Sequence, residues 1–236
     1  MKERGILFSS AMVRSLLAGT KTQTRRVVKP HRGDDAFVLV GQEDGSWWPY
    51  RSPDGESMVM GDGCEYPFEC KYGRAGDKLW VREAWRAAKS LDGFSPTGIA
   101  EKCLGAGYKT PWCPTQYEAD QWRNGGWSGF DTPPIVTEPG RLRAGMHMPR
   151  WASRITLEII EVRVERLQDI SQADAMAEGA PPSHPSIDKV SREFGHPDFS
   201  RSWYAQLWEE INGPGSWEAN PWVWCVSFKR VEAISG

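Results

Sequence analysis

The sequence predicts an α+β fold built on a small mixed β-barrel, with short flanking helices and two long insertions. Three observations support this prediction: strand-like segments outnumber helix-like ones, the βαβ rhythm of a parallel sheet is missing, and no internal repeat is detectable. The 236 residues suit one large domain or a small domain with insertions. We interpret the chain as a single domain over residues 1–236, with insertions over about residues 31–72 and 88–145.

The first third of the chain contains strand, helix and strand signals in that order. Residues 5–8 form an apolar run typical of a strand, and Ser9 or Ser10 can then cap a helix that ends before Gly19. Residues 25–29 predict the next strand. Residues 31–63 are rich in Gly, Asp, Ser and Pro, which indicates an elaborated hairpin or a mobile flap.

The remainder alternates regular and irregular segments. A turn over residues 73–77 leads into an alternating strand over residues 78–83, and residues 90–143 form a second long irregular region. The strongest strand signal covers residues 155–164. The sequence ends with regular elements: a short helix from a cap at Ser171 through Glu178, an amphipathic helix over residues 199–211, and a closing strand over residues 222–231.

The turn after the first helix carries the densest functional signal. Residues 15–26 read SLLAGTKTQTRR, so a lysine, threonines and two arginines follow directly after the helix stop at Gly19. Such a turn lets side chains converge on a polar ligand, for instance one that carries phosphate. The alternative interpretation is a basic surface loop.

Composition limits the classes of function. The net charge of −2 excludes a polycation, so any nucleic-acid contact must be local. No apolar run reaches the roughly 20 residues of a membrane span, and the first residues lack the apolar core of a signal peptide. We therefore expect a soluble, cytoplasmic protein that does not associate with membranes.

The five cysteines argue against a disulfide framework because their number is odd. Four of them could in principle form a thiolate zinc site, but their spacing lacks tight Cys-x-x-Cys pairs (Cys64, Cys70, Cys103 and Cys113). We favour ordinary buried or free thiols and expect neither a metal nor a cofactor. Of the thirteen tryptophans, we assign most to the core and retain Trp85 as a candidate for stacking on a base.

Several motifs resemble the ASCH family. These are LAGTKTQTR over residues 17–25, GDKLWV over residues 76–81 and LQDI over residues 167–170. The segments MPRWASR (residues 148–154) and NPWVW (residues 220–224) resemble the longer members found in phages and prophages. The resemblance implies a β-barrel of the PUA-like type, named after the pseudouridine synthase and archaeosine transglycosylase domain. The two insertions have no counterpart in the minimal ASCH domain.

The resemblance also implies a catalytic set. The family includes a bacterial amidohydrolase that removes the acetyl group from N(4)-acetylcytidine with a lysine, a threonine three residues later, and a glutamate near the end of the short helix. These residues correspond to Lys21, Thr24 and Glu178. This chain is more than twice as long as that enzyme, and its insertions can reshape the pocket.

The chemistry of those three residues can be judged separately. Amide hydrolysis needs an activated nucleophile, a base, and an acid for the departing amine. A lysine base near pH 7.5 requires its pKa to fall from about 10.4 by roughly three, equivalent to about 4 kcal/mol. Burial beside Arg25 or Arg26 lowers it, whereas an ionised Glu178 raises it; a protonated Glu178 could act as the acid. Taken singly, each residue is also typical of a structural position.

Two functions from different classes follow. The first is hydrolysis of an acyl group on the exocyclic amine of a modified nucleoside or nucleotide. The second is a noncatalytic module that binds single-stranded RNA or DNA, with phosphates held by the basic turn. Candidate substrate-binding residues in either case are Arg25, Arg26, Arg82, Trp85, Arg150 and Arg154. Ion pairs of these arginines with Asp77, Glu83 or Glu158 are the structural alternative, and the sequence leaves the oligomeric state open.

Overall fold

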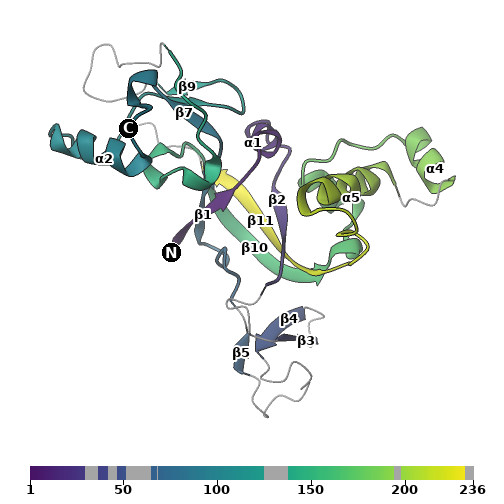
Figure 1. The fold of residues 1–236 in the computed structure, drawn as a ribbon. Coiled ribbons are helices and arrows are strands. Elements are labelled where there is room, and N and C mark those ends of the chain that lie inside the picture. Colours follow the sequence, from purple (N-terminus) through teal and green to yellow (C-terminus); the bar gives the residue numbers. More distant parts are fainter. Residues whose placement is uncertain are drawn as a thin grey trace. The chain divides into compact units, whose positions relative to one another are not determined.

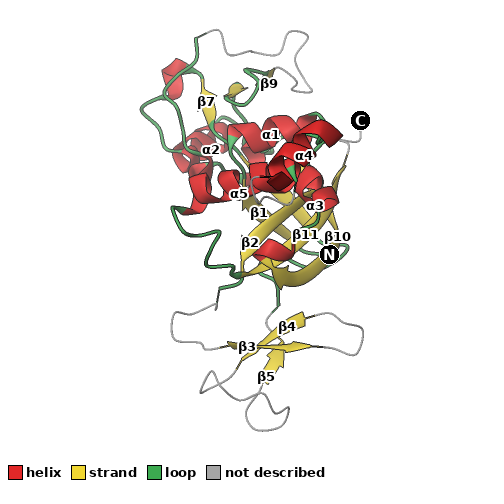
Figure 2. Cartoon of the chain, turned by 90° about the vertical axis from the view of Figure 1, so that its right-hand side faces the viewer, coloured by secondary structure: helices red, strands yellow, loops and turns green. Residues whose placement is uncertain are grey.

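The computed structural model describes residues 1–29, 37–41, 47–51, 65–67, 69–124, 138–193 and 198–231 (Figure 1). These residues form a mixture of helices and strands, as Figure 2 shows by colour. They group into two compact units. Of the described residues, the first unit comprises 1–19, 78–124, 138–158 and 230–231, and the second comprises 20–29, 37–41, 47–51, 65–67, 69–77, 159–193 and 198–229. The α+β class predicted from the sequence is confirmed.

The first unit begins with β1 (Glu3–Leu7), which pairs in parallel with β6 (Lys78–Arg82). The first residues of β10 (Thr156–Arg166) pair antiparallel with β6. A small antiparallel sheet has the order β7-β8-β9. The remaining elements of this unit are α1 (Ser10–Leu17), β7 (Trp85–Ala87), α2 (Pro96–Gly105), β8 (Thr115–Tyr117), β9 (Arg123–Asn124) and short 3-10 turns at Lys89–Leu91, Gly145–His147 and Arg150–Ala152.

The second unit contains the remainder of β10 and most of β11 (Trp222–Val231), which Figure 1 shows running beside each other. β11 pairs antiparallel with β2 (Gln23–Val27), so the hydrogen-bonded order is β10-β11-β2. After β10 come a 3-10 turn (Leu167–Asp169) and the helices of this unit, which are α3 (Gln172–Ala177), α4 (Pro185–Glu193) and α5 (Phe199–Asn212). Residues of α3 contact both α5 and β2.

The hairpin predicted within residues 31–63 is present in part. β3 (Phe37–Gly41) and β4 (Trp47–Arg51) pair antiparallel, and β5 (Glu65–Pro67) adds to β4. The interpretation of the rest of this insertion as a flap falls on residues outside those described. The described strands do not close into a barrel. Barrel closure therefore stays a prediction.

The helix signals in the sequence were well placed. Ser9 caps α1 and its hydroxyl accepts a hydrogen bond from the Met12 N–H, and Ser171 caps α3 in the same way. α5 and β11 lie within one residue of the predicted bounds. The predicted strand over residues 25–29 was misplaced: β2 begins at Gln23, because Ser227 on β11 continues the pairing that far.

Two helices were missed. The region over residues 90–143 was predicted to be irregular, yet it contains α2 with a Ser95 cap followed by Pro96 at the first helical position. That pairing of a serine with a proline is a helix-start signal that sequence reasoning passed over. α4 was also missed, and its helical segment has no buried residue to produce an apolar stripe.

Each unit has its own hydrophobic cluster. In the first unit the cluster surrounds Trp85 and Tyr117, and in the second it surrounds Leu167, Tyr204 and Trp208. Leu167 and Ile170 follow β10 directly and are completely buried. The second cluster lies beneath α3 and α5, so it fixes the helix that carries Glu178.

Replacing Leu167 with alanine tests this anchoring. Loss of a fully buried leucine leaves a cavity, so the free energy of unfolding should fall by about 2–5 kcal/mol. Ile211→Ala, at a half-exposed position of α5, should change it by no more than about 0.5 kcal/mol. Urea unfolding measures both. Equal losses in the two variants would contradict the assignment of Leu167 to the core.

Candidate functional site

A buried lysine–glutamate pair forms the centre of the candidate site. The Lys21 Nζ lies 2.6 Å from the Glu178 Oε2 and donates a second hydrogen bond to the Glu178 main-chain carbonyl at 2.8 Å. The backbone brings the two residues together. Gly19 turns the chain with a φ of +74°, and the Thr22 N–H then donates to the Ala177 carbonyl at 2.8 Å. The meeting of Lys21 and Glu178 that the sequence predicted is present.

Glu178 owes its position to the end of a helix. It is the C-terminal cap residue of α3, and Gly179 follows with a φ of +106°. That left-handed conformation favours glycine and ends the helix. The predicted end of this helix at Glu178 is therefore correct, and the glutamate lies at the last turn of α3.

Burial governs the electrostatics of Lys21. Only 2% of the residue is exposed, and burial lowers the pKa of its ammonium group below the ordinary value. The Glu178 carboxylate acts in the opposite direction, whereas Arg26 and Arg25 lower the pKa further. The direction matches what a lysine base requires.

Arg25 joins the pair to a larger charge network. Its Nη1 lies 3.5 Å from the Glu178 Oε1, its Nη2 lies 3.3 Å from the Asp174 Oδ2, and it also pairs with Glu165. Its Nη1 donates to Gln23 at 2.5 Å. Burial opposes the charge, but Cys225 and the surrounding carboxylates more than compensate, so the pKa of Arg25 lies above its usual range.

The network is balanced in charge. Arg163 on β10 donates to the Glu165 Oε2 at 3.1 Å and to the Asp174 Oδ2 at 3.0 Å. Burial raises the pKa of Asp174, but Arg25 and Arg163 outweigh it and lower that pKa overall. Four cations thus face four carboxylates: Lys21, Arg25, Arg26 and Arg163 against Glu161, Glu165, Asp174 and Glu178.

Thr24, the candidate nucleophile, is completely buried on β2. Its Oγ1 accepts a hydrogen bond from the Arg26 Nη1 at 2.8 Å, and the same guanidinium donates to the Arg25 carbonyl at 3.0 Å. A cationic donor on the threonine oxygen stabilises negative charge that develops there. Arg26 therefore contacts the candidate nucleophile, a contact that the sequence did not predict.

Tyr204 on α5 closes the network from the helical side. Its hydroxyl lies 3.5 Å from the Glu178 Oε1, and the residue is buried. Burial, followed by the charge of Glu178, raises the pKa of Tyr204 well above its usual value, so the phenol keeps its proton and donates to the carboxylate. The sequence placed this tyrosine on a helix without any link to the site.

The remaining predicted binding residues lie in the first unit and are already engaged. Arg154 forms ion pairs with Glu83 at 2.9 Å and with Asp120 at 2.9 Å. The pair with Glu83 is the one that the sequence offered as the alternative to ligand binding. Arg150 pairs with Glu3. The Arg82 guanidinium stacks over the Trp80 ring. Trp85 has no exposed surface, so its predicted stacking on a base is excluded in this conformation.

The cysteines in the described residues are buried free thiols (Cys70, Cys103, Cys113 and Cys225), and Cys64 lies outside those residues. Burial raises the pKa of Cys113 to about 11, so its thiol stays protonated. Across the described ranges, no group of histidine, cysteine or acidic side chains could hold a metal ion. In the same ranges, no helix is long and apolar enough to cross a bilayer.

Comparisons with known proteins leave the family open. No protein-family model and no curated protein match the chain. It is similar to one solved structure, described as protein EF3133 from Enterococcus faecalis V583 with the family model DUF984. The two share 9% identity, with 100% of this chain and 84% of that chain covered, and the TM-score is 0.37. A likeness at this level carries no argument about fold or function.

Substitution of Arg25 tests whether the network is a structural unit. Arg25→Met leaves three buried or partly buried carboxylates without their shared cation, so the free energy of unfolding should fall by about 3–5 kcal/mol. Arg150→Met breaks a half-exposed pair and should cost about 1 kcal/mol or less. Denaturant unfolding at pH 7 compares the two. Similar losses would refute the dependence on Arg25.

Proposed function

We propose that the protein is a hydrolase that cleaves the amide bond of an acyl group on the exocyclic amine of a modified nucleoside or nucleotide. N(4)-acetylcytidine is the most concrete substrate. The proposal includes a PUA-like fold of the ASCH type, in the long form of phages and prophages. The ASCH-like motifs that point to Lys21, Thr24 and Glu178 support the proposal, as does the contact of Lys21 with Glu178.

The observation that carries the proposal is the buried contact between Lys21 and Glu178. Lys21 has only 2% of its surface exposed and lies 2.6 Å from the Glu178 carboxylate, an arrangement that a simple surface charge does not need. Burial of such a pair is costly unless geometry and hydrogen bonds compensate. Burial lowers the pKa of Lys21, and a lowered pKa suits a base that works nearer neutral pH.

The proposed reaction has two halves. Lys21 takes the proton of the Thr24 hydroxyl while the threonine oxygen attacks the amide carbonyl carbon, with Arg26 stabilising charge on that oxygen. The C–N bond breaks, and the departing amine receives a proton from the Lys21–Glu178 pair. Water then hydrolyses the threonine ester, releases the carboxylate and restores the hydroxyl.

Access to the site requires local opening. Thr24, Lys21 and Glu178 are all at least 95% buried, so a substrate must displace contacts to reach them. The alternative function, binding of single-stranded RNA or DNA, would use the same turn for phosphates. The charge network disfavours nucleic-acid binding in part, because Arg25 is only 1% exposed and the charge of Arg25 is already matched by carboxylates.

Thr24→Ala provides the direct test. Deleting the hydroxyl should abolish hydrolysis of acetylated cytidine and leave ligand affinity within a few-fold, because the nucleophile is lost with little change in shape. Lys21→Ala and Glu178→Ala should be about as damaging, since members of one catalytic unit do not contribute additively. Chromatographic detection of released cytidine measures turnover.

The matched control is Thr22→Ala, which removes the same hydroxyl from an exposed position two residues away and should retain activity. If the unmodified protein turns over no acylated nucleoside yet binds RNA or DNA through Lys21 and Arg26, the hydrolase is wrong and the binding module replaces it.

The pH dependence of kcat/KM tests the base. Activity should rise with pH as Lys21 loses its proton, with a midpoint below the usual 10.5, because burial lowers that pKa. Arg26→Ala removes a charge that lowers the pKa of Lys21, so the rising limb should move to higher pH. Arg26→Lys keeps the charge and should leave the midpoint near its original value. A profile that falls over this range would exclude Lys21 as the base.

A further inference from the structure

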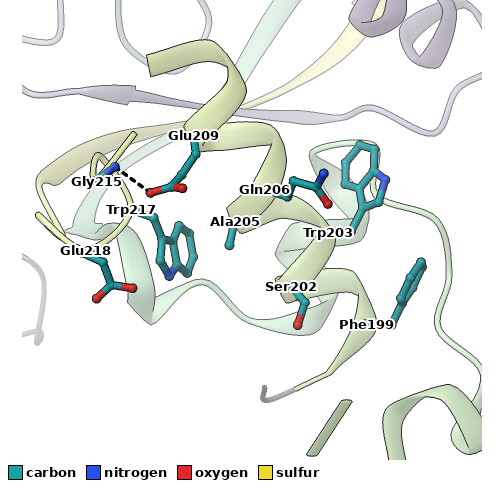
Figure 3. Close-up of a pocket in the computed structure, with 9 residues that line it drawn as sticks. All are labelled: Phe199, Ser202, Trp203, Ala205, Gln206, Glu209, Gly215, Trp217 and Glu218. Atoms are coloured by element: carbon teal, nitrogen blue, oxygen red, sulfur yellow. Dashed lines mark hydrogen bonds between the residues drawn. The ribbon is translucent and has the colours of Figure 1, made fainter. Parts of the chain in front are cut away.

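A concave site lies beside α5, and none of its lining residues belongs to the charge network. It is a pocket of about 660 Å³, between α5 and the loop that follows it (Figure 3). A pocket of this volume is in the range that holds small organic ligands. Its nine lining residues are Phe199, Ser202, Trp203, Ala205, Gln206, Glu209, Gly215, Trp217 and Glu218.

The lining combines aromatic rings with negative charge. Phe199, Trp203 and Trp217 supply three rings, while Glu209 and Glu218 supply two carboxylates. None of the nine lining residues is a lysine, arginine or histidine. Carboxylates repel phosphate groups, so the pocket is unsuited to a nucleotide. Indole rings and carboxylates both attract an organic cation.

The charge lies at one end of the pocket. Figure 3 shows both carboxylates with Trp217 on the left, and Trp203 and Phe199 on the right. Phe199 and Glu209 are ten residues apart on α5, which separates their backbones by about 15 Å along the helix. Glu209 also belongs to the last turn of α5, where the helix dipole is negative. A ligand that fits is elongated, with a cationic head and an apolar body.

Several contacts hold this arrangement before any ligand arrives. The Gly215 N–H donates to the Glu209 Oε1 at 3.0 Å, drawn as the dashed line in Figure 3. The Trp217 ring packs edge-to-face on Tyr204 at 6.4 Å, and the Trp217 carbonyl accepts from the Gln168 Nε2 at 2.9 Å. Fixed side chains reduce the entropy lost on binding.

We propose that this pocket binds a small amphiphilic organic cation, with its ammonium or guanidinium group between Glu209 and Glu218 and its apolar body along Trp217 and Trp203. None of the lining residues belongs to the proposed catalytic set, and the proposal does not require the hydrolase activity.

The experiment uses isothermal titration calorimetry of the full chain with three probes of one shape: 4-phenylbutylammonium, the neutral 4-phenylbutanol and the anionic 5-phenylpentanoate. The ammonium should bind at least threefold more tightly than the alcohol, and the carboxylate more weakly still. Equal binding of ammonium and alcohol, or no binding of the ammonium at millimolar concentration, would overturn the proposal. This comparison needs no variant.

Variants then locate the bound cation. Glu209→Gln and Glu218→Gln should each weaken ammonium binding about three- to fivefold, as expected for partly exposed charge pairs. Glu101→Gln is the matched control, because it makes the same change at an exposed position of α2 that does not line the pocket, and it should leave affinity within twofold. Equal effects of Glu209→Gln and Glu101→Gln would assign the binding to general charge and refute the site.

Discussion

The contact of Arg25 with three carboxylates is the interaction on which the second unit depends. Its guanidinium reaches Glu165 on β10, Asp174 on α3 and Glu178 at the end of α3. Each of these carboxylates would be costly to bury without a cation nearby. The planar Arg25 guanidinium, with its five N–H donors, therefore holds β10 and both α3 and its C-terminal end in one arrangement. The lysine at the candidate centre lies in this fixed frame.

The same balance of charge sets the chemistry available at the site. Lys21 experiences a lowered pKa from burial and from two arginines, opposed by one carboxylate. Moving a proton along the 2.6 Å between Nζ and Oε2 converts an ion pair into a neutral pair without any change in the net charge of the network. In the proposed reaction this pair would give and take a proton in turn. Structural and chemical roles thus share the same atoms.

Local signals in the sequence predicted much of this architecture. The caps at Ser9 and Ser171 and several alternating strands were identified from adjacent residues, and the ASCH-like motifs grouped Lys21 with Glu178. The partners that complete the network were missed. Glu165, Asp174 and Tyr204 reach Arg25 or Glu178 only through the packing of β10, α3 and α5, and their spacing in the sequence encodes none of those contacts. Trp85 was predicted to stack on a base but is completely buried. The residue type alone does not indicate whether a tryptophan side chain is exposed.

The two hydrogen bonds of Lys21 to one residue have a consequence for preorganisation. The Lys21 ammonium group donates hydrogen bonds to both the main-chain carbonyl and the carboxylate of Glu178. These two bonds connect the glutamate side chain to its own backbone and restrict its rotamers. A glutamate freed of such a tie samples several rotamers, and confining it costs up to about 2 kcal/mol. In this protein the side chain of Glu178 loses that conformational entropy on folding, before any ligand binds. In the proposed reaction, a substrate that enters the site would find the Glu178 carboxyl group already held in one orientation, with its binding free energy left for positioning the amide.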